Sequence, residues 1–219
     1  MQSRLRMLLL PALCLMLIAC ACSRRPTSTA DVPRVISPSY VISVAPFTQP
    51  INASQLITGR IPEDQGRIAD EQLPSLDRRF RNVLTTDSKR QYKYIDAIDL
   101  SKDLTRFHSS EQPQALPLWI AYGKKQGAQL LLVPQILDWH ERQGSTAGVT
   151  EPAHVRVEFF LINIANGSIM SRSVFEERQE GLVDNLMNVG TFFKRRGQWV
   201  TAEELTEDGM RKAVKDMGL

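Results

Sequence analysis

The apolar positions of the chain follow two periods, and these separate expected strands from expected helices. Compact β-branched runs and strict alternation are typical of strands, whereas apolar residues three and four positions apart are typical of helices. Strands are predicted at residues 40–47, 91–97, 129–137, 154–164 and 169–176. Helices are predicted at residues 73–86, 115–125, 182–193 and 201–217.

The connections between these elements carry turn signals. Ala165-Asn166-Gly167-Ser168 is typical of the tight turn of a hairpin. Residues 48–72 predict a long loop, and residues 138–150 predict a hairpin loop, because both are polar and contain glycine. Pro134 has no backbone N–H, so it predicts an edge or a bulge in the far half of its strand.

The order of the predicted elements is β-α-β-α-β-β-β-α-α. Helices that alternate with strands and then follow a hairpin indicate an α/β fold, with α+β as the alternative. We expect a single mixed sheet with helices packed on it. The last helix has the clearest start, because Thr201 and Glu204 have the spacing of a capping box.

The first residues have the pattern of a secretory signal. Arg4 and Arg6 precede an apolar run of 13 residues, Met7 to Ala19. This run is too short to cross a bilayer, which takes about 20 residues. It has the length of the apolar region of a signal peptide. Residues 1–19 are therefore predicted to be a signal peptide.

The end of the apolar run, Leu17-Ile18-Ala19-Cys20, resembles the lipobox of bacterial lipoproteins. The resemblance implies that the Cys20 thiol carries a diacylglycerol, that cleavage follows Ala19, and that the new amine receives an acyl chain such as palmitate. Two or three acyl chains hold a protein firmly at a membrane, where one does so only marginally. Ordinary signal cleavage that leaves Cys22 first, and acylation of Cys22, are the alternatives.

The remaining composition describes the part that follows the signal. Residues 20–39 contain the acylated cysteine and a polar, proline-rich stretch that predicts a flexible tether, and residues 40–219 predict a globular periplasmic domain. No cysteine follows Cys22, which excludes a disulfide within the domain. Loss of the signal changes the formal charge from +3 to +1, so no nucleic-acid partner is expected. Ala21 after the acylated cysteine, in place of aspartate, favours the inner leaflet of the outer membrane.

Three segments carry a family resemblance: YVISVAPF, GAQLLLVPQI and FFLINIANGSIM. Over about residues 40–180 they resemble the fold group of the TolB amino-terminal domain, the curli secretion lipoprotein and LpoB. Gly127-Ala128-Gln129 stands where that group has Ala-Asp, and Asn163 to Gly167 replaces its acidic turn. The resemblance implies a non-catalytic role in which the chain assembles, activates or stabilises another envelope complex.

Catalytic signatures are absent from the sequence. It contains no Gly-x-Ser-x-Gly, His-Glu-x-x-His, phosphate-binding loop or Gly-x-Gly-x-x-Gly pattern, so no catalytic residue is predicted. Asp138-Trp139-His140-Glu141 brings polar ligand types together, but a solvated strand end with a half-buried Trp139 is favoured over a metal site. His108 and His154 show no partner in the sequence. No metal is predicted, and no cofactor besides the lipid on Cys20.

One stretch near the C-terminus suggests a contact surface. Aromatic residues there run into cations, which suits anionic lipid headgroups or an acidic partner; the candidates are Phe192, Phe193, Lys194, Arg195, Arg196 and Trp199. The alternative is that Phe193 and Trp199 fill the core while the cations are solvated at a helix end. Arg78-Arg79-Phe80-Arg81 is interpreted as a solvated helix face.

These patterns predict a membrane-anchored periplasmic lipoprotein that performs no chemistry and binds or stabilises another envelope component. The alternative is a periplasmic small-ligand binder or hydrolase with a site near the 48–72 loop. The expected partners are the membrane, through the anchor, and an envelope protein; a homo-oligomer stays open.

Overall fold

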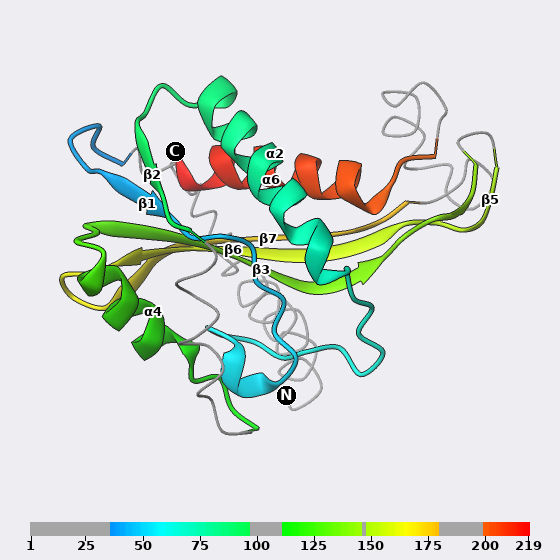
Figure 1. Cartoon of the computed structure of the whole chain (residues 1–219), viewed down its shortest axis with the longest axis horizontal. Coiled ribbons are helices and arrows are strands. Elements are labelled where there is room, and N and C mark those ends of the chain that lie inside the picture. The colour runs from blue at the N-terminus through cyan, green and yellow to red at the C-terminus, as the bar shows by residue number, and fades with distance from the viewer. Residues whose placement is uncertain (1–35, 97–110, 146–147, 180–198) are drawn as a thin grey trace, which may run out of the picture. The chain divides into compact units, whose positions relative to one another are not determined.

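A mixed five-stranded sheet lies at the centre of the computed structural model, which describes residues 36–96, 111–145, 148–179 and 199–219 (Figure 1). These residues fall within one unit of the chain, Pro33–Leu219. The strand order is β2-β1-β3-β6-β7. The strands are β1 (Ile42–Val44), β2 (Tyr92–Tyr94), β3 (Leu130–His140), β6 (His154–Asn163) and β7 (Ser168–Arg178).

Strand direction divides the sheet into two parts. β1 pairs in parallel with β2 and β3, whereas β6 pairs antiparallel with both β3 and β7. The three antiparallel strands are long and continue well beyond the end of β1. A short hairpin of β4 (Gln143–Gly144) and β5 (Val149–Glu151) extends from the far end of β3 and β6.

Helices cover both faces of the sheet (Figure 1). α2 (Leu73–Asp87) and α6 (Ala202–Met217) lie together on one face, and α4 (Ala115–Lys125) lies on the other. Two short 3-10 helices, η1 (Ala53–Gln55) and η2 (Asp70–Gln72), lie in the segment between β1 and α2. The expected α/β fold, a single mixed sheet with helices packed on it, is confirmed.

Under α2 and α6, β3 and β6 present an apolar face along most of their length. Phe159 is fully buried, and its ring lies 6.2 Å from that of Phe47 and 5.4 Å from that of Phe80. Trp139 and Val155 continue this core to the far end of the strands. Burial of such side chains contributes about 1.5–3 kcal/mol each, so this face is the main source of the domain's stability.

The opposite face is apolar only where α4 covers it. Trp119 and Tyr122 of α4 pack against β3 and β6, where Val133 and Phe160 are buried. Gly123 permits this close approach, since a Cβ there would collide with Ile164. The apolar cover therefore ends near the middle of the long strands.

The predicted helices inside the described residues agree closely with the structure. The helix predicted at 73–86 is observed at Leu73–Asp87, and the one at 115–125 is observed with the same bounds. The capping box is confirmed, because the Thr201 hydroxyl accepts from the Glu204 N–H at 3.1 Å while the Glu204 carboxylate accepts from the Thr201 N–H at 2.8 Å. The helix predicted at 182–193 lies outside the described residues.

β3 departs from the prediction, because residues 138–140, expected in a hairpin loop, belong to the strand. They pair with β6 as far as His140, opposite His154. The expectation that the half of the strand beyond Pro134 is an edge or contains a bulge is confirmed. β1 ends at Val44, opposite Leu132, and the register of β3 against β6 shifts between Ile136 and Asp138.

The signal peptide, Cys20 and most of the predicted tether lie outside the described residues. Within the described part of the chain, none of the helices combines the length and the apolar character that a membrane span requires.

Candidate functional site

A polar cavity of about 510 Å³ opens on the α4 side of the sheet, beyond the end of α4's apolar cover. Its lining comes from the 48–72 loop, β3, the end of β5 with the turn that follows it, the start of β6, and β7. The lining residues are Arg60, Pro62, Asp64, Asp138, His140, Glu151, Pro152, His154, Arg156, Glu176 and Arg178.

A β-bulge directs the β3 residues toward this cavity. Val133 and Gln135 face the α4 side before the register shift. The extra residue in the shift changes the alternation, so Asp138 and His140 face that side afterwards and Trp139 joins the opposite core. Without the bulge, the indole would point into the cavity and both polar side chains into the core.

The loop that covers this part of β3 is held by hydrogen bonds to it. The Trp139 N–H donates to the Gly66 carbonyl at 3.2 Å, and the Gln65 amide donates to the Leu137 carbonyl at 3.0 Å. Nearer to α4, the Ile57 N–H donates to the Gln135 amide oxygen at 3.1 Å. The long loop is thus fixed on the strand that supplies the polar side chains.

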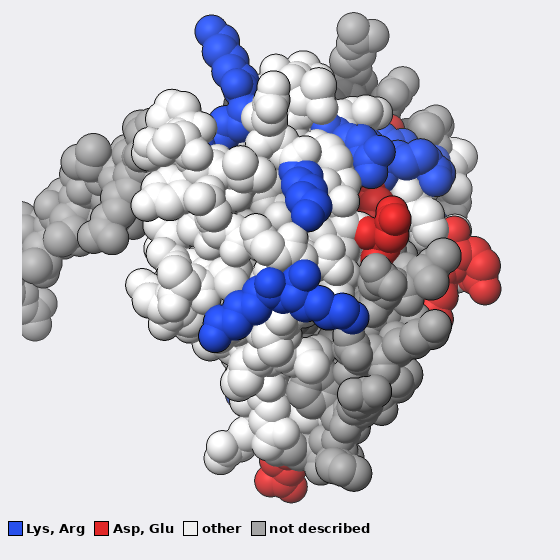
Figure 2. Space-filling view, turned by 60° about the vertical axis from the view of Figure 1, so that its left-hand side comes forward, with Lys and Arg blue, Asp and Glu red and all other residues white. Residues whose placement is uncertain are grey.

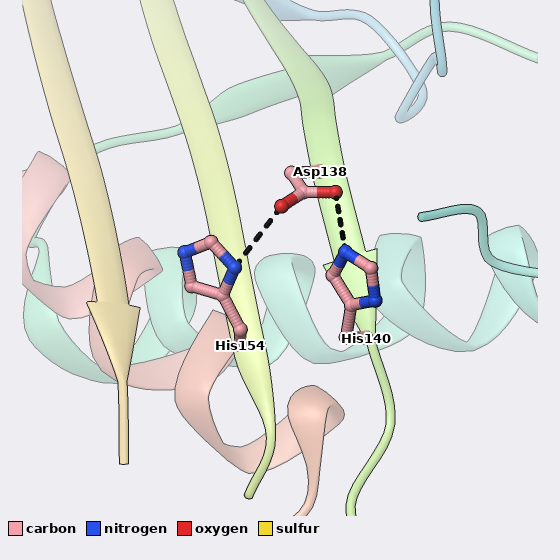
Figure 3. Close-up of side chains that lie close together, drawn as sticks. All are labelled: Asp138, His140 and His154. Carbon is pink, nitrogen blue, oxygen red and sulfur yellow. Dashed lines mark ion pairs between the residues drawn. The ribbon is translucent and has the colours of Figure 1, made fainter. Parts of the chain in front are cut away.

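Asp138 is the centre of the site (Figure 3). Its Oδ1 accepts from the Gly66 N–H at 2.7 Å and from the Trp139 N–H at 3.1 Å, and lies 3.1 Å from His140 Nε2. Its Oδ2 lies 3.0 Å from His154 Nδ1. Only 6% of the Asp138 side chain is exposed, so a carboxylate is held nearly out of water between two imidazoles.

The two imidazole rings lie parallel to one another on neighbouring strands. Their centroids are 5.9 Å apart and their planes differ by 14°. The other nitrogen of His154, Nε2, is 3.9 Å from the Glu176 carboxylate on β7. His140 is 45% exposed and His154 is 26% exposed, so both rings are accessible from the cavity.

A buried ion-pair group borders the cavity on β6 and β7. The Glu158 side chain is fully buried, and its Oε2 accepts from Arg172 Nε at 3.0 Å and Nη2 at 2.7 Å. Arg156 lies between Glu158, at 3.3 Å, and Glu176, at 3.5 Å. These arginines are therefore engaged by carboxylates, and Asp138 has no Lys or Arg partner among the described residues.

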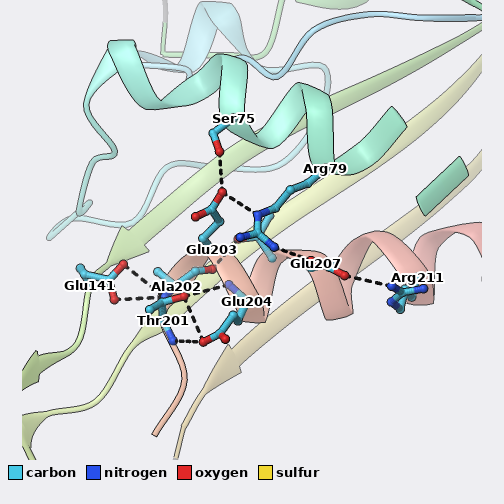
Figure 4. Close-up of polar contacts among 10 residues, drawn as sticks. Ser75, Arg79, Glu141, Thr201, Ala202, Glu203, Glu204, Glu207 and Arg211 are labelled. Atoms are coloured by element: carbon cyan, nitrogen blue, oxygen red, sulfur yellow. Dashed lines mark hydrogen bonds and ion pairs between the residues drawn. The ribbon is translucent and has the colours of Figure 1, made fainter. Parts of the chain in front are cut away.

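The expectation of a solvated strand end at 138–141 was wrong for Asp138 and Trp139, whereas His140 and Glu141 are exposed. Asp138 and Trp139 are 4% and 6% exposed, because the bulge turns each toward a covered face. The view that His154 has no partner was also wrong, since β-pairing brings it to Asp138. Glu141 does not belong to the site, because its carboxylate accepts from the Ala202 N–H at the start of α6 (Figure 4).

The prediction that no metal is bound stays a prediction, and the structure brings Asp138, His140 and His154 together as a group of potential ligands. His140 lies opposite His154 because β3 continues past Leu137, where the sequence predicted its end, and pairs with β6 there. Arg60 and Asp64 come from the loop that the alternative hypothesis named.

The basic segments predicted in the sequence have different positions. Phe192, Phe193, Lys194, Arg195 and Arg196 lie outside the described residues. Trp199 is half-buried, and its carbonyl accepts from Arg142 Nη1 at 3.1 Å.

The earlier basic run on α2 is largely a solvated face, as predicted, although Phe80 within it is buried. Arg79 bonds to Glu203 and Glu207 of α6, each at 2.6 Å (Figure 4), and Arg81 lies 4.2 Å above the Tyr94 ring. At the end of the domain where β1 and β2 lie, Lys and Arg side chains stand apart among uncharged ones (Figure 2). No single concentrated basic patch is visible in that view.

The fold and the site define a small α/β domain with a polar cavity on one sheet face. No family model matches the chain, and the comparison with curated proteins found no match. The chain is similar to the PelC dodecamer from Paraburkholderia phytofirmans, with 12% identity over 85% of this chain and 92% of that one, and a TM-score of 0.48.

Two further solved structures resemble it. Lipoprotein GNA1162 from Neisseria meningitidis has 10% identity over 72% of this chain and 95% of that one, with a TM-score of 0.38. The LpoB C-terminal domain from Salmonella enterica has 16% identity over 64% of this chain and 83% of that one, with a TM-score of 0.34. LpoB belongs to the fold group that the sequence resembles. These similarities concern the layout of the fold alone.

Proposed function

We propose that this chain is a bacterial envelope lipoprotein, held at the membrane by acyl chains on Cys20, whose periplasmic domain binds another envelope component without catalysis. The observation that carries the proposal is Leu17-Ile18-Ala19-Cys20 at the end of an apolar run of 13 residues. This arrangement supports lipid attachment at Cys20, and Ala21 supports the inner leaflet of the outer membrane.

The composition of the cavity supports binding rather than covalent chemistry. Its lining contains no serine, threonine, cysteine or lysine, and the nucleophile types that it does contain are carboxylates and two imidazoles. Of the charged groups in the lining, Arg156 is held between Glu158 and Glu176, and His154 contacts Asp138 and Glu176. Such a set offers charges and hydrogen bonds to a partner on a rigid strand platform.

The anchor is tested with two neighbouring cysteines. Cys20→Ala and Cys22→Ala are expressed in full-length form and fed a labelled palmitate analogue, and the mature N-terminal peptide is weighed by mass spectrometry. We expect label and diacylglyceryl mass in the wild type and in Cys22→Ala, and neither in Cys20→Ala. Firm membrane association should be lost with the label, because it takes two or more chains. Label that persists in Cys20→Ala would reject the anchor assignment.

The partner is tested by site-specific photo-crosslinking in intact membranes. A photoreactive residue at Pro62, on the cavity, is compared with one at Phe193, in the predicted basic and aromatic stretch, and with one at the exposed Met170 as the control. We expect a defined product from Pro62 or Phe193 that Met170 does not give. Identical products from all three positions would contradict a specific binding surface.

The cavity also favours a second candidate, a binder of a small polar ligand. Its volume of about 510 Å³ lies within the range of small-molecule sites, and the 48–72 loop supplies Arg60, Pro62 and Asp64 to its wall. Native mass spectrometry of the purified chain distinguishes the two. A stoichiometric small molecule, lost in Arg60→Ala and retained in the control Arg90→Ala, would favour this candidate.

A further inference from the structure

The group of Asp138, His140 and His154 goes beyond the proposed function, since partner binding does not require it. Each residue offers one ligand atom, and the three atoms all lie within 4.8 Å of one another. They come from two neighbouring strands, at directly paired positions or two residues apart (Figure 3). We propose that these three side chains bind a divalent transition-metal ion of the zinc class.

The ligand types and spacing fit such an ion. Zinc prefers imidazole nitrogen and carboxylate oxygen at about 2.0–2.2 Å, which places tetrahedral ligands roughly 3.3 Å from one another. Asp138 lies 3.1 Å from His140 Nε2 and 3.0 Å from His154 Nδ1. These two contacts use different oxygens of Asp138, Oδ1 and Oδ2, so the ion would be seated by side-chain rotations that bring one oxygen and both ring nitrogens to a common centre.

The charge of the site favours a cation. The Asp138 carboxylate is 6% exposed and has no Lys or Arg partner among the described residues. A buried carboxylate without a cation is unfavourable, and metal coordination is one of the ways in which proteins stabilise it. The cavity wall adds three further carboxylates, those of Asp64, Glu151 and Glu176, and three arginines, Arg60, Arg156 and Arg178, so with Asp138 the acidic groups outnumber the basic ones by one. Arg156 does not compete for Asp138, because Glu158 and Glu176 hold it.

Groups that contact the proposed ligands, without being ligands themselves, orient them, as such groups do in established metal sites. The N–H groups of Gly66 and Trp139 donate to Asp138 Oδ1 at 2.7 and 3.1 Å, which fixes the carboxylate and leaves Oδ2 toward His154. Glu176 lies 3.9 Å from the far nitrogen of His154. Gly66 leaves room for the His140 ring, because a Cβ there would stand 2.8 Å from His140 Nε2.

The site keeps an open side. Three protein ligands leave a fourth zinc position free, and the cavity of about 510 Å³ provides room there for water or for a donor from a partner. The 45% exposure of His140 gives the ion a route of entry from solvent.

The test uses the full-length chain purified in detergent and stripped with a chelator. Zinc affinity is measured by competition with a chromophoric chelator, and cobalt is added separately because its visible absorption reports tetrahedral nitrogen and oxygen ligands. We expect one ion per chain in the wild type, with a cobalt band and a zinc-dependent rise in Tm.

The variants use the composition of the chain, which contains three histidines. His140→Ala and His154→Ala should each weaken zinc binding by more than about 100-fold, since even the loss of an outer group costs roughly 10–100-fold. Asp138→Asn, which keeps the acceptor for the Gly66 N–H, should lower affinity and shift the cobalt band. His108→Ala is the matched control and should bind as the wild type does.

Folding is checked separately from metal binding. Each metal-free variant is compared with the metal-free wild type by circular dichroism and Tm, so that a misfolded protein is recognised. Gly66→Ala serves as a second probe of the site, because a Cβ there would collide with the Trp139 carbonyl and stand 2.8 Å from His140 Nε2, so it shifts the loop and the ring without removing a ligand; it should weaken zinc binding by roughly 10–100-fold.

The proposal is overturned by absence of stoichiometric zinc in the folded wild type, or by unchanged affinity in the folded double variant His140→Ala/His154→Ala. It would also fail if His108→Ala removed binding. None of these outcomes bears on the acylation of Cys20, so the two proposals are tested independently.

Discussion

The far halves of β3, β6 and β7 present two faces of opposite chemistry. On one face, Trp139, Val155 and Val157 are buried against α2 and α6. On the other, Asp138 and His154, their neighbours in sequence, line a polar cavity under the 48–72 loop. The same three strands thus build a core on one side and a site on the other.

The difference shows that the elements packed on each face of the sheet, and not the strand sequence alone, determine whether that face forms a core or a polar site. Where α4 lies over the sheet, the facing residues are apolar, and where it ends, they become polar. The bulge between Ile136 and Asp138 makes this change without placing a polar group in the core. The apolar face fixes the strands, and it thereby fixes the positions of the polar groups on the other side.

The largest expected effect comes from the apolar face, through Phe159→Ala. Phe159 is fully buried between Phe47 and Phe80, and loss of such a ring removes about 3–5 kcal/mol from the free energy of unfolding. Urea unfolding followed by tryptophan fluorescence measures it. The matched change on the other face is Val174→Ala, where the side chain is 38% exposed and the expected loss is within about 0.5 kcal/mol. Equal losses in the two variants would refute the division between the faces.

A middle effect is expected from Glu158→Gln, on the polar face but below the cavity. The change removes the charge that Arg172 and Arg156 contact, and hydrogen bonds to charged groups contribute about 1.5–3 kcal/mol. The control is Glu176→Gln, since Glu176 is 51% exposed and its ion pair contributes about 0–1 kcal/mol. Both are measured with a chelator present, which separates the ion pairs from any metal effect. A loss for Glu158→Gln no greater than that of the control would mean that this buried group is not a structural support.

Local pattern was enough to predict the elements. The helix at 115–125 and the capping box at Thr201 depend on residues close together in sequence, and both are confirmed. β3 was predicted too short, because a strand that becomes polar on one face and aromatic on the other looks like a loop once a bulge breaks its alternation.

The site was harder to predict, because it depends on pairing between distant segments. Asp138 and His140 were noticed, but His154 joins them only through the register of β3 against β6. Gly66, whose N–H fixes Asp138, lies 72 residues away in sequence and carries no side-chain signal of its own. The sequence therefore indicates the types of group present but not which of them meet.

The smallest effect is expected at the partly exposed contact between α2 and α6, the two helices that cover the apolar face. Burial alone raises the pKa of Glu203, but the hydrogen bonds from Arg79 and Ser75 outweigh it, so its pKa lies below the ordinary value of 4.5 (Figure 4). A carboxylate whose pKa is lower in the folded state stabilises the fold above its unfolded pKa. This contribution is lost as the pH falls through the folded pKa.

Glu203→Gln should therefore cost up to about 1 kcal/mol at neutral pH, since Glu203 and Arg79 are partly exposed. The cost should shrink when urea unfolding is repeated roughly one unit below the ordinary glutamate value of 4.5. The exposed Glu71, in η2, gives the control, and Glu71→Gln should change little at either pH. A cost for Glu203→Gln that is independent of pH would show that its side chain acts by packing and not by charge. The ion pair between Glu203 and Arg79 would then contribute nothing to the packing of α6 on the apolar face.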